Sequence, residues 1–380
     1  MNTGRLKKSG IAAVTAAVLF TGCGNINPNA TLVTINDGEG TKDTITLGYG
    51  NFVARYQQSM YDQYLLAYYG EDMWKSDMSG TGSTLEDDTK DGVLEDLEEQ
   101  YLAKKHAGDY GVELTEEQNT AIAEAAAQFI ADNDEESLDV MGATEEYVKQ
   151  YLEDRTYYSL VSAAAKEASD ADISDEDCWM RTFTYVVFDT TGTTDENGTL
   201  VEYTEDEVKD LENQAKTLAT AADFDATVED LGVSASTYSY LKGEEEDSTM
   251  DMTIIEAAEK LSEGDVSDVI EIDGVGYYVI RLDSDHDEDA SQSKRESLQT
   301  EAFNTLMDSW KEAITWTVDE KAWAKVKFDS LFKAPEVEET EETTEDTTTE
   351  ETTEDTTAEE DAEETSEETT DETTEETEAE

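Results

Sequence analysis

The last segment of the chain, residues 336–380, limits where a folded core can form. It consists mainly of glutamate and threonine, and it contains 24 acidic and no basic residues. Because its charges repel one another and few apolar side chains are available to offset the entropy of ordering, we expect this tail to be disordered. Two roles remain open for it, a solubilising spacer or a loose sink for Ca²⁺ or cationic polypeptides. The folded domains must therefore lie before residue 336.

Acidic residues also dominate the rest of the chain. The formal charge is −71, from 96 acidic and 25 basic residues, so the residues before the tail still carry −47. Phosphate binding requires a basic surface, and we therefore expect no nucleic-acid partner. The same repulsion disfavours direct binding to an anionic membrane surface.

The N-terminus has the pattern of an export signal. A basic start containing Arg5, Lys7 and Lys8 precedes the apolar run 11–20, which is too short to span a bilayer as a mature helix. The run continues into "LFTGC", which resembles a bacterial lipobox ending at Cys23. We expect residues 1–22 to be a lipoprotein signal peptide and 23–29 a lipidated linker, so that Cys23 anchors an extracytoplasmic protein to the bacterial cell membrane. The alternatives are an ordinary signal peptide cut elsewhere, or a buried cysteine at position 23.

The sequence pattern of residues 30–172 predicts a helical domain that begins with a β-hairpin. Strand-like "TLVTIN" and "TITLGYG" flank a turn, and four amphipathic helices are expected over 51–70, 91–111, 114–132 and 143–168. The third opens with the capping box Thr115/Gln118. The first carries an aromatic stripe at four-residue steps, made of Phe52, Tyr56, Met60, Tyr64 and Tyr68. The stripe either packs against neighbouring helices or forms an open apolar surface for unfolded chain.

Residues 173–290 switch to a mixed pattern of strands and helices. A β-rich run at 182–188 is followed by a helix with the capping box Thr204/Glu207, a polar stretch, a short helix begun by Thr253, and the hairpin "IEIDGVGYYVIRL" at 270–282. A further helix rich in large apolar residues occupies much of 291–335. The predicted fold class is α+β, with the mixed domain inserted between N-terminal helices and a C-terminal segment that packs on them.

The sequence contains few of the residues that enzymes use for covalent or metal chemistry. Its two histidines are His106, which follows two lysines and reads as a surface residue, and His286. The acidic run around His286 lacks the glycine and terminal glutamate of an EF-hand loop. Cys178 reads as a small apolar residue. No Ser/His/Asp signature, CxxC, phosphate-binding loop or HExxH helix is present, so we expect no cofactor and no metal site.

The mixed domain resembles the parvulin peptidyl-prolyl isomerases. "LSEGDVS" at 261–267 and "GYYVI" at 276–280 match the family's helix ending and its last strand, while "TFTYVVF" is similar to its first strand. In the family each of these two strands carries a histidine, and here the resemblance places Tyr185 and Tyr278 in those positions. It also implies a proline pocket at Met250 and Ile254, and a polar loop near Tyr240.

With its lipobox, hairpin, N-terminal helices and C-terminal helix, the chain from 30 to 330 resembles extracytoplasmic foldases of the PrsA and SurA type. This resemblance implies a membrane-anchored foldase that binds unfolded or proline-containing secreted polypeptides, with isomerase activity that is weak or absent. Two alternatives remain open. One is a binding lipoprotein in which the parvulin-like domain is only a scaffold, and the other, less favoured because no pair of α/β lobes is visible, is a solute-binding lipoprotein.

Overall fold

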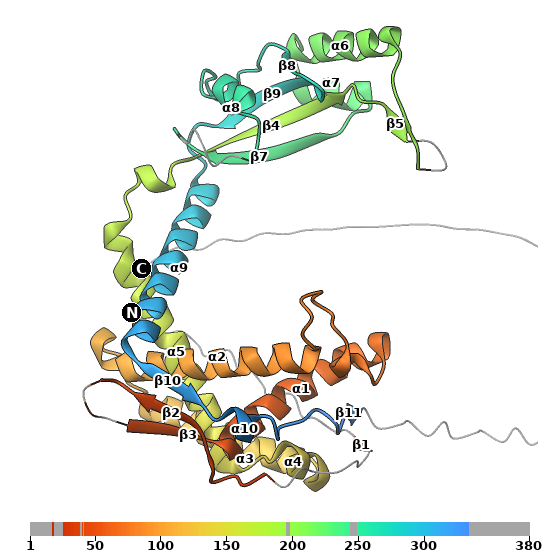
Figure 1. The fold of residues 1–380 in the computed structure, drawn as a ribbon. Helices are drawn as coiled ribbons and strands as arrows, with labels where there is room; N and C mark the ends of the chain where they lie inside the picture. Colours follow the sequence, from red (N-terminus) through yellow and green to blue (C-terminus); the bar gives the residue numbers. More distant parts are fainter. Residues whose placement is uncertain are drawn as a thin grey trace, which may run out of the picture. The chain divides into compact units, whose positions relative to one another are not determined.

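The computed structural model describes residues 17–18, 26–38, 40, 42–194, 198–243 and 249–333 (Figure 1). Apart from Ala17–Val18, the predicted signal peptide lies outside the described residues, as do Cys23 and the tail 336–380. Within the described part of the chain, no helix combines the length and the apolar character needed to cross a membrane.

Helices form most of the N-terminal half. The α-helices are α1 (Leu47–Tyr69), α2 (Leu85–His106), α3 (Glu116–Asp132), α4 (Glu135–Met141), α5 (Glu145–Ser169), α6 (Glu205–Ala219), α7 (Phe224–Leu231), α8 (Met252–Ala258), α9 (Glu288–Ala313) and α10 (Glu320–Trp323). Short 3₁₀ turns lie at Met73–Lys75, Ala107–Tyr110, Asp170–Asp172 and Glu176–Cys178. The capping boxes at Thr115 and Thr204 are both present, as the sequence predicts.

The strands form small antiparallel sheets. They are β1 (Ala17–Val18), β2 (Thr31–Asn36), β3 (Lys42–Thr46), β4 (Met180–Asp189), β5 (Thr193–Thr194), β6 (Leu200–Val201), β7 (Ala235–Leu241), β8 (Ile270–Ile272), β9 (Gly276–Ser284), β10 (Thr315–Val318) and β11 (Phe332–Lys333). The larger sheets have the orders β7-β4-β9-β8 and β10-β2-β3, and β1-β11 and β5-β6 are two-stranded. We call the four-stranded sheet with α6, α7 and α8 the sheet module, and the remaining helices with β2, β3 and β10 the helical module.

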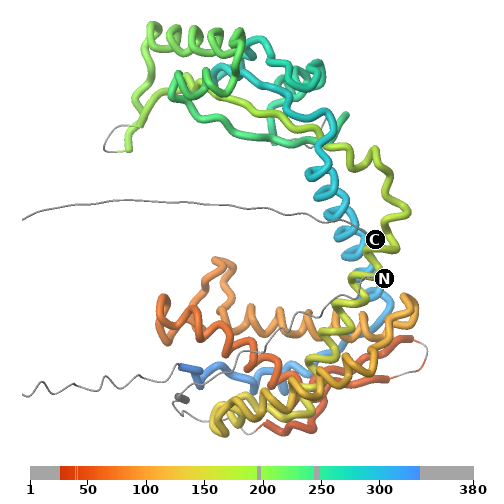
Figure 2. The backbone as a smooth tube through the Cα atoms, turned by 180° about the vertical axis from the view of Figure 1, so that it is seen from behind, coloured from red at the N-terminus to blue at the C-terminus, as the bar shows by residue number. Residues whose placement is uncertain are grey.

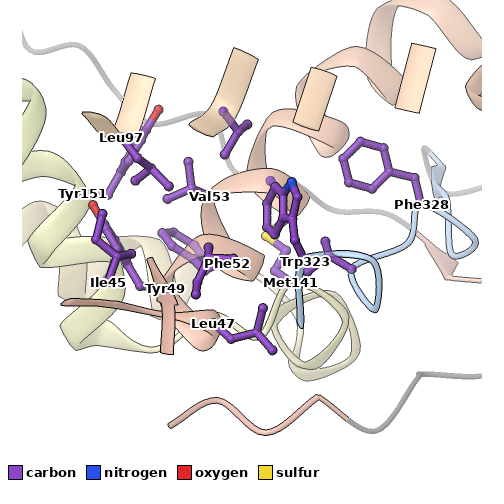
Figure 3. Packing of buried hydrophobic residues seen from close by; sticks show 14 of the residues in the cluster. Ile45, Leu47, Tyr49, Phe52, Val53, Leu97, Met141, Tyr151, Trp323 and Phe328 are labelled. Carbon is purple, nitrogen blue, oxygen red and sulfur yellow. The ribbon is translucent and has the colours of Figure 1, made fainter. Parts of the chain in front are cut away.

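The first half of α1 forms the centre of the helical module. Phe52 is 1% exposed and contacts Tyr147 and Tyr151 of α5 by their rings (Figure 3). At Gly50 the helix lies close to β2, because a Cβ atom there would lie 2.3 Å from Cδ2 of Leu32. A larger residue at this position would require the Leu32 side chain to move.

The chain after α9 returns to the helical module. β10 pairs with β2 in an antiparallel register that places Trp316 opposite Ile35. Beyond it, Trp323 and Phe328 are buried in the same apolar cluster as α1 (Figure 3). α9 itself packs beside α5, as both ribbon views show (Figure 2), with Phe303 and Met307 in one cluster with Val161. The helical module thus contains both ends of the folded chain.

A buried carboxylate fastens this C-terminal segment to α1. Asp62 is 2% exposed, and its Oδ2 accepts hydrogen bonds from the backbone N–H of Phe332 at 2.9 Å and from Nε2 of Gln58 at 3.1 Å. Its Oδ1 accepts from Nε1 of Trp74 at 2.8 Å. Burial raises the pKa of Asp62 to about 6, although these donors and the nearby Arg55 act to lower it.

The raised pKa of Asp62 predicts a pH-dependent contribution to stability. A carboxyl whose folded pKa exceeds its unfolded value favours the folded state most below about pH 4, and the benefit is lost as the pH rises through about 6. The stability of the wild type relative to Asp62→Asn, measured as the difference between their free energies of unfolding, should therefore be about 1 kcal/mol greater at pH 5 than at pH 7.5.

Denaturant unfolding of both proteins at the two pH values measures this difference. Asp132→Asn, at an exposed position near the end of α3, controls for the loss of one negative charge from a strongly acidic chain. If the difference in unfolding free energy between the wild type and Asp62→Asn were equal at pH 5 and pH 7.5, the raised pKa of Asp62 would be contradicted.

Candidate functional site

The two central strands of the sheet module divide their side chains between two apolar layers. Alternate residues of a strand face opposite sides of its sheet. On β4, Phe183 and Tyr185 belong to the layer covered by α8, whereas Val186 and Phe188 belong to the layer covered by α6 and α7. The neighbouring strand β9 alternates in the same way, so each face of the sheet has its own core.

The adjacent tyrosines of β9 lie on opposite faces. Tyr278 joins the α8 layer and Tyr277 joins the α6/α7 layer, as strand alternation predicts. In the β4–β9 register, Tyr185 is opposite Ile280 and Val187 is opposite Tyr278, which makes the two tyrosines diagonal neighbours. Their rings stack with a centroid distance of 6.1 Å and an angle of 30°. Both are half-buried, and they form a partly open aromatic pair.

The other residues that the sequence singled out lie in the same cluster. Met250, Ile254 and Tyr240 all pack in the α8 layer with the tyrosine pair. Their exposure differs, because Ile254 is 1% exposed and Tyr240 3%, while Met250 is half-buried. Ile254 and Tyr240 therefore form the floor beneath the pair, and Met250 lies at its edge.

Sequence reasoning missed two residues of this surface. Val187, on the same side of β4 as Tyr185, leaves 38% of its surface exposed beside Tyr278. Tyr238 of β7 packs in the cluster, and its hydroxyl lies 3.2 Å from the Thr249 hydroxyl. The signal was available, since Tyr238 and Tyr240 alternate with serine along "STYSYL", but the segment was interpreted only as a polar stretch.

A buried arginine supports the floor of the site. Arg181 on β4 is 2% exposed, and its Nη1 donates to the Tyr240 hydroxyl at 3.1 Å. Its two terminal nitrogens also donate to backbone carbonyls at the end of α8 and form ion pairs with Glu259 and Asp285 at 3.1 and 3.0 Å. Arg181 therefore ties α8 to the sheet, and nothing in the sequence reasoning identified it.

The electrostatics of the site favour the neutral form of Tyr278. Burial raises the pKa of Tyr278, and the nearby Tyr185, Asp189 and Asp251 raise it further. Its hydroxyl therefore stays protonated at neutral pH and is available as a hydrogen-bond donor. Such a pair offers apolar walls and hydroxyl donors but no general base.

The remaining chemical candidates lie elsewhere. The His106 ring stacks on Trp310 with a 4.2 Å centroid distance, and the His286 ring stacks on Trp179 at the same distance. Burial raises the pKa of the Cys178 thiol. Among the residues that the structure describes, no group of three or more His, Cys, Asp or Glu side chains is placed to hold a metal ion.

The aromatic stripe of α1 divides into a buried and an exposed half. Phe52 lies in the core and Tyr56 is half-buried against it, but Tyr64 is 65% and Tyr68 84% exposed. The exposed half also contains Tyr61 and Tyr69, at 36% and 58%. The first half of the stripe thus packs against neighbouring helices, and its second half presents an exposed aromatic surface, which we call the α1 tyrosine patch. Binding of unfolded chain by this patch stays a prediction.

Comparisons with known proteins place the chain beside foldases of known structure. No family model and no curated protein matches the sequence. Solved structures of foldases are similar to it. The foldase protein PrsA of Streptococcus pneumoniae is 19% identical, with 63% of this chain and 89% of that chain covered and a TM-score of 0.26. PrsA of Lactococcus lactis is 15% identical, with 78% and 97% covered and a TM-score of 0.31. A SurA-like chaperone of Campylobacter jejuni is 12% identical, with 77% and 100% covered and a TM-score of 0.27.

Replacing the buried arginine tests its role in holding the floor of the site. Arg181→Met should lower the free energy of unfolding by about 2 kcal/mol, because the Tyr240 hydroxyl and two backbone carbonyls lose their donor while the ion-pair partners remain partly solvated. Urea unfolding measures the loss. Arg281→Met is the matched control, since Arg281 lies on the same sheet but pairs with the exposed Asp225, and we expect a loss below about 1 kcal/mol. Equal losses in both variants would contradict a special role for Arg181.

Proposed function

We propose that the protein is a membrane-anchored extracytoplasmic foldase that binds unfolded polypeptides and catalyses weak cis-trans isomerisation of prolyl bonds. The observation that carries this proposal is the convergence of Tyr185, Tyr278, Met250, Ile254 and Tyr240 on one partly open apolar cluster. These residues come from separate parts of the sequence, and the resemblance to parvulins had assigned them to one site. Anchoring through lipid on Cys23 is part of the proposal and is supported by the lipobox-like sequence.

The chemistry of prolyl isomerisation suits such a cluster. An X–Pro bond must cross a barrier of about 20 kcal/mol by twisting its amide out of resonance, and this step needs neither a nucleophile nor a metal. A site accelerates it by desolvating the amide and by binding the twisted form more tightly than the planar one. Met250, backed by the buried Ile254, supplies an apolar seat for the ring, and Tyr278 supplies a hydroxyl that can donate to a peptide carbonyl.

The tyrosines limit the rate that this site can reach. A pair of imidazoles can share and redistribute a proton within a hydrogen-bond network. Two phenols whose ring centroids lie 6.1 Å apart act only as walls and hydrogen-bond donors. The expected activity is therefore weak, and binding of polypeptide carries much of the function.

A protease-coupled assay on a proline peptide tests the catalytic part. Tyr278→Ala should lower kcat/KM about tenfold, because one hydrogen bond and one wall of the site are lost. Tyr277→Ala is the matched control, since it removes the adjacent tyrosine of the same strand from the opposite face, and kcat/KM should change less than about twofold. A wild-type rate equal to the uncatalysed rate at high protein concentration would rule out isomerase activity.

The α1 tyrosine patch favours a second candidate function, binding of unfolded chain without catalysis.

Tyr64→Ser with Tyr68→Ser should weaken suppression of client aggregation about tenfold, because these side chains offer exposed apolar area to a client. Light scattering of a denatured client diluted into each variant measures the effect. Gln63→Ser with Ala67→Ser alters two exposed neighbours on the same turns and should leave suppression unchanged. Undiminished suppression in the tyrosine variant would remove the patch from the binding surface.

A further inference from the structure

Two aspartates flank the aromatic pair of the sheet module. Asp189 follows Val187 by two residues on β4 and therefore lies on the same side of the strand as Tyr185 and Val187. Its register partner is Gly276, two residues before Tyr278. On the other side, Asp251 is the N-cap of α8 and sits between Met250 and Met252, both of which pack in the cluster.

Both carboxylates are held in place by hydrogen bonds. Oδ1 of Asp189 accepts from the backbone N–H and the hydroxyl of Thr191 at 2.7 and 2.6 Å, and these bonds lower the pKa of Asp189. Oδ1 of Asp251 accepts from the backbone N–H of Thr253 at 2.8 Å. Both side chains are exposed, and neither forms an ion pair within the described residues. They are fixed, solvated negative charges at the edge of an apolar surface.

The large cations of the same module are engaged elsewhere. Arg181 is buried beneath the cluster with Glu259 and Asp285. Arg281 lies on the opposite face, where it binds Asp225 and Asp283 and lies over the ring of Phe224. The charges that act on Tyr278 therefore come from Asp189 and Asp251. A ligand seated on the tyrosine pair therefore meets two negative charges.

We propose that the site selects prolines flanked directly by lysine or arginine, an inference that rests on the proposed isomerase function. A cation beside the proline gains Coulomb attraction from Asp189 and Asp251 and can also lie against the face of Tyr185 or Tyr278. A glutamate in the same place is repelled by both carboxylates. Asp189 and Asp251 are then specificity residues for a basic class of substrate sequence.

Tetrapeptides with lysine, leucine or glutamate directly before proline, and a second series with the same residues directly after it, test the inference. At low ionic strength, kcat/KM for the lysine peptide should be about fivefold higher than for the glutamate peptide in one of the two series. An effect of this size is expected from two solvated carboxylates. The preference should shrink in 0.5 M salt because such charges are screened. Binding of the same peptides, labelled with a fluorophore, is measured in parallel so that affinity is known even where turnover is slow.

Charge-neutral variants assign the preference to these two residues. Asp189→Asn with Asp251→Asn keeps the hydrogen-bond acceptors at the strand end and the helix cap, and it should bring the lysine-to-glutamate ratio close to one. Glu271→Gln is the matched control, because Glu271 acts on Tyr277 at the opposite face, and it should leave the ratio unchanged. Equal turnover of lysine and glutamate peptides in both series would overturn the inference while leaving the isomerase intact. Absence of both turnover and binding for every peptide would overturn the proposed function, and the inference with it.

Discussion

The pairing of β10 with β2 sets the topology of the described part of the chain before the tail. It brings the segment that follows the sheet module back to the first long strand of the fold, so the sheet module is an insertion with two closely held ends. The chain leaves through α5 and returns through α9, and Arg295 on α9 bridges Asp170 and Asp175 just after α5. Within the sheet, the entering strand β4 and the leaving strand β9 are direct neighbours. The tyrosine pair thus lies on the two strands that connect directly to the helical module.

Where sequence patterns reflected local chemistry, they predicted the structure well. Thr115 and Thr204 cap their helices because a threonine oxygen and a glutamine or glutamate three residues later satisfy free N–H groups without help from distant parts of the chain. The turn at Asp273–Gly274 forms the hairpin β8–β9, and strand alternation separates Tyr277 from Tyr278. The convergence of Tyr185 and Tyr278 was accessible only through the resemblance to parvulins, since no local pattern relates two strands so far apart in sequence.

Two errors are local. The short helix α8 was expected to begin at Thr253, but Asp251 caps it, and α4 was missed because its seven residues carry little periodicity. The other errors occurred where tertiary packing determines the outcome. The exposed half of α1 could not be separated from its buried half, since both have the same apolar spacing and only the position of neighbouring helices distinguishes Phe52 from Tyr68. Arg181 was overlooked because a lone arginine in a strand gives no indication that it will be buried beneath an adjacent helix.

Tyrosines suit the acidic surroundings of the aromatic pair better than histidines would. An imidazole placed between Asp189 and Asp251 would be held in its charged form by two carboxylates, and a protonated ring can no longer act as an acceptor. Burial and the same carboxylates also raise the pKa of Tyr278, but the protonated form of a phenol is neutral. The acidic surroundings that would fix an imidazolium therefore leave a tyrosine unchanged as a donor. The proposed binding of cationic polypeptide is thus compatible with a neutral, hydrogen-bonding aromatic surface at the same site, although tyrosines do not allow the proton exchange of two imidazoles.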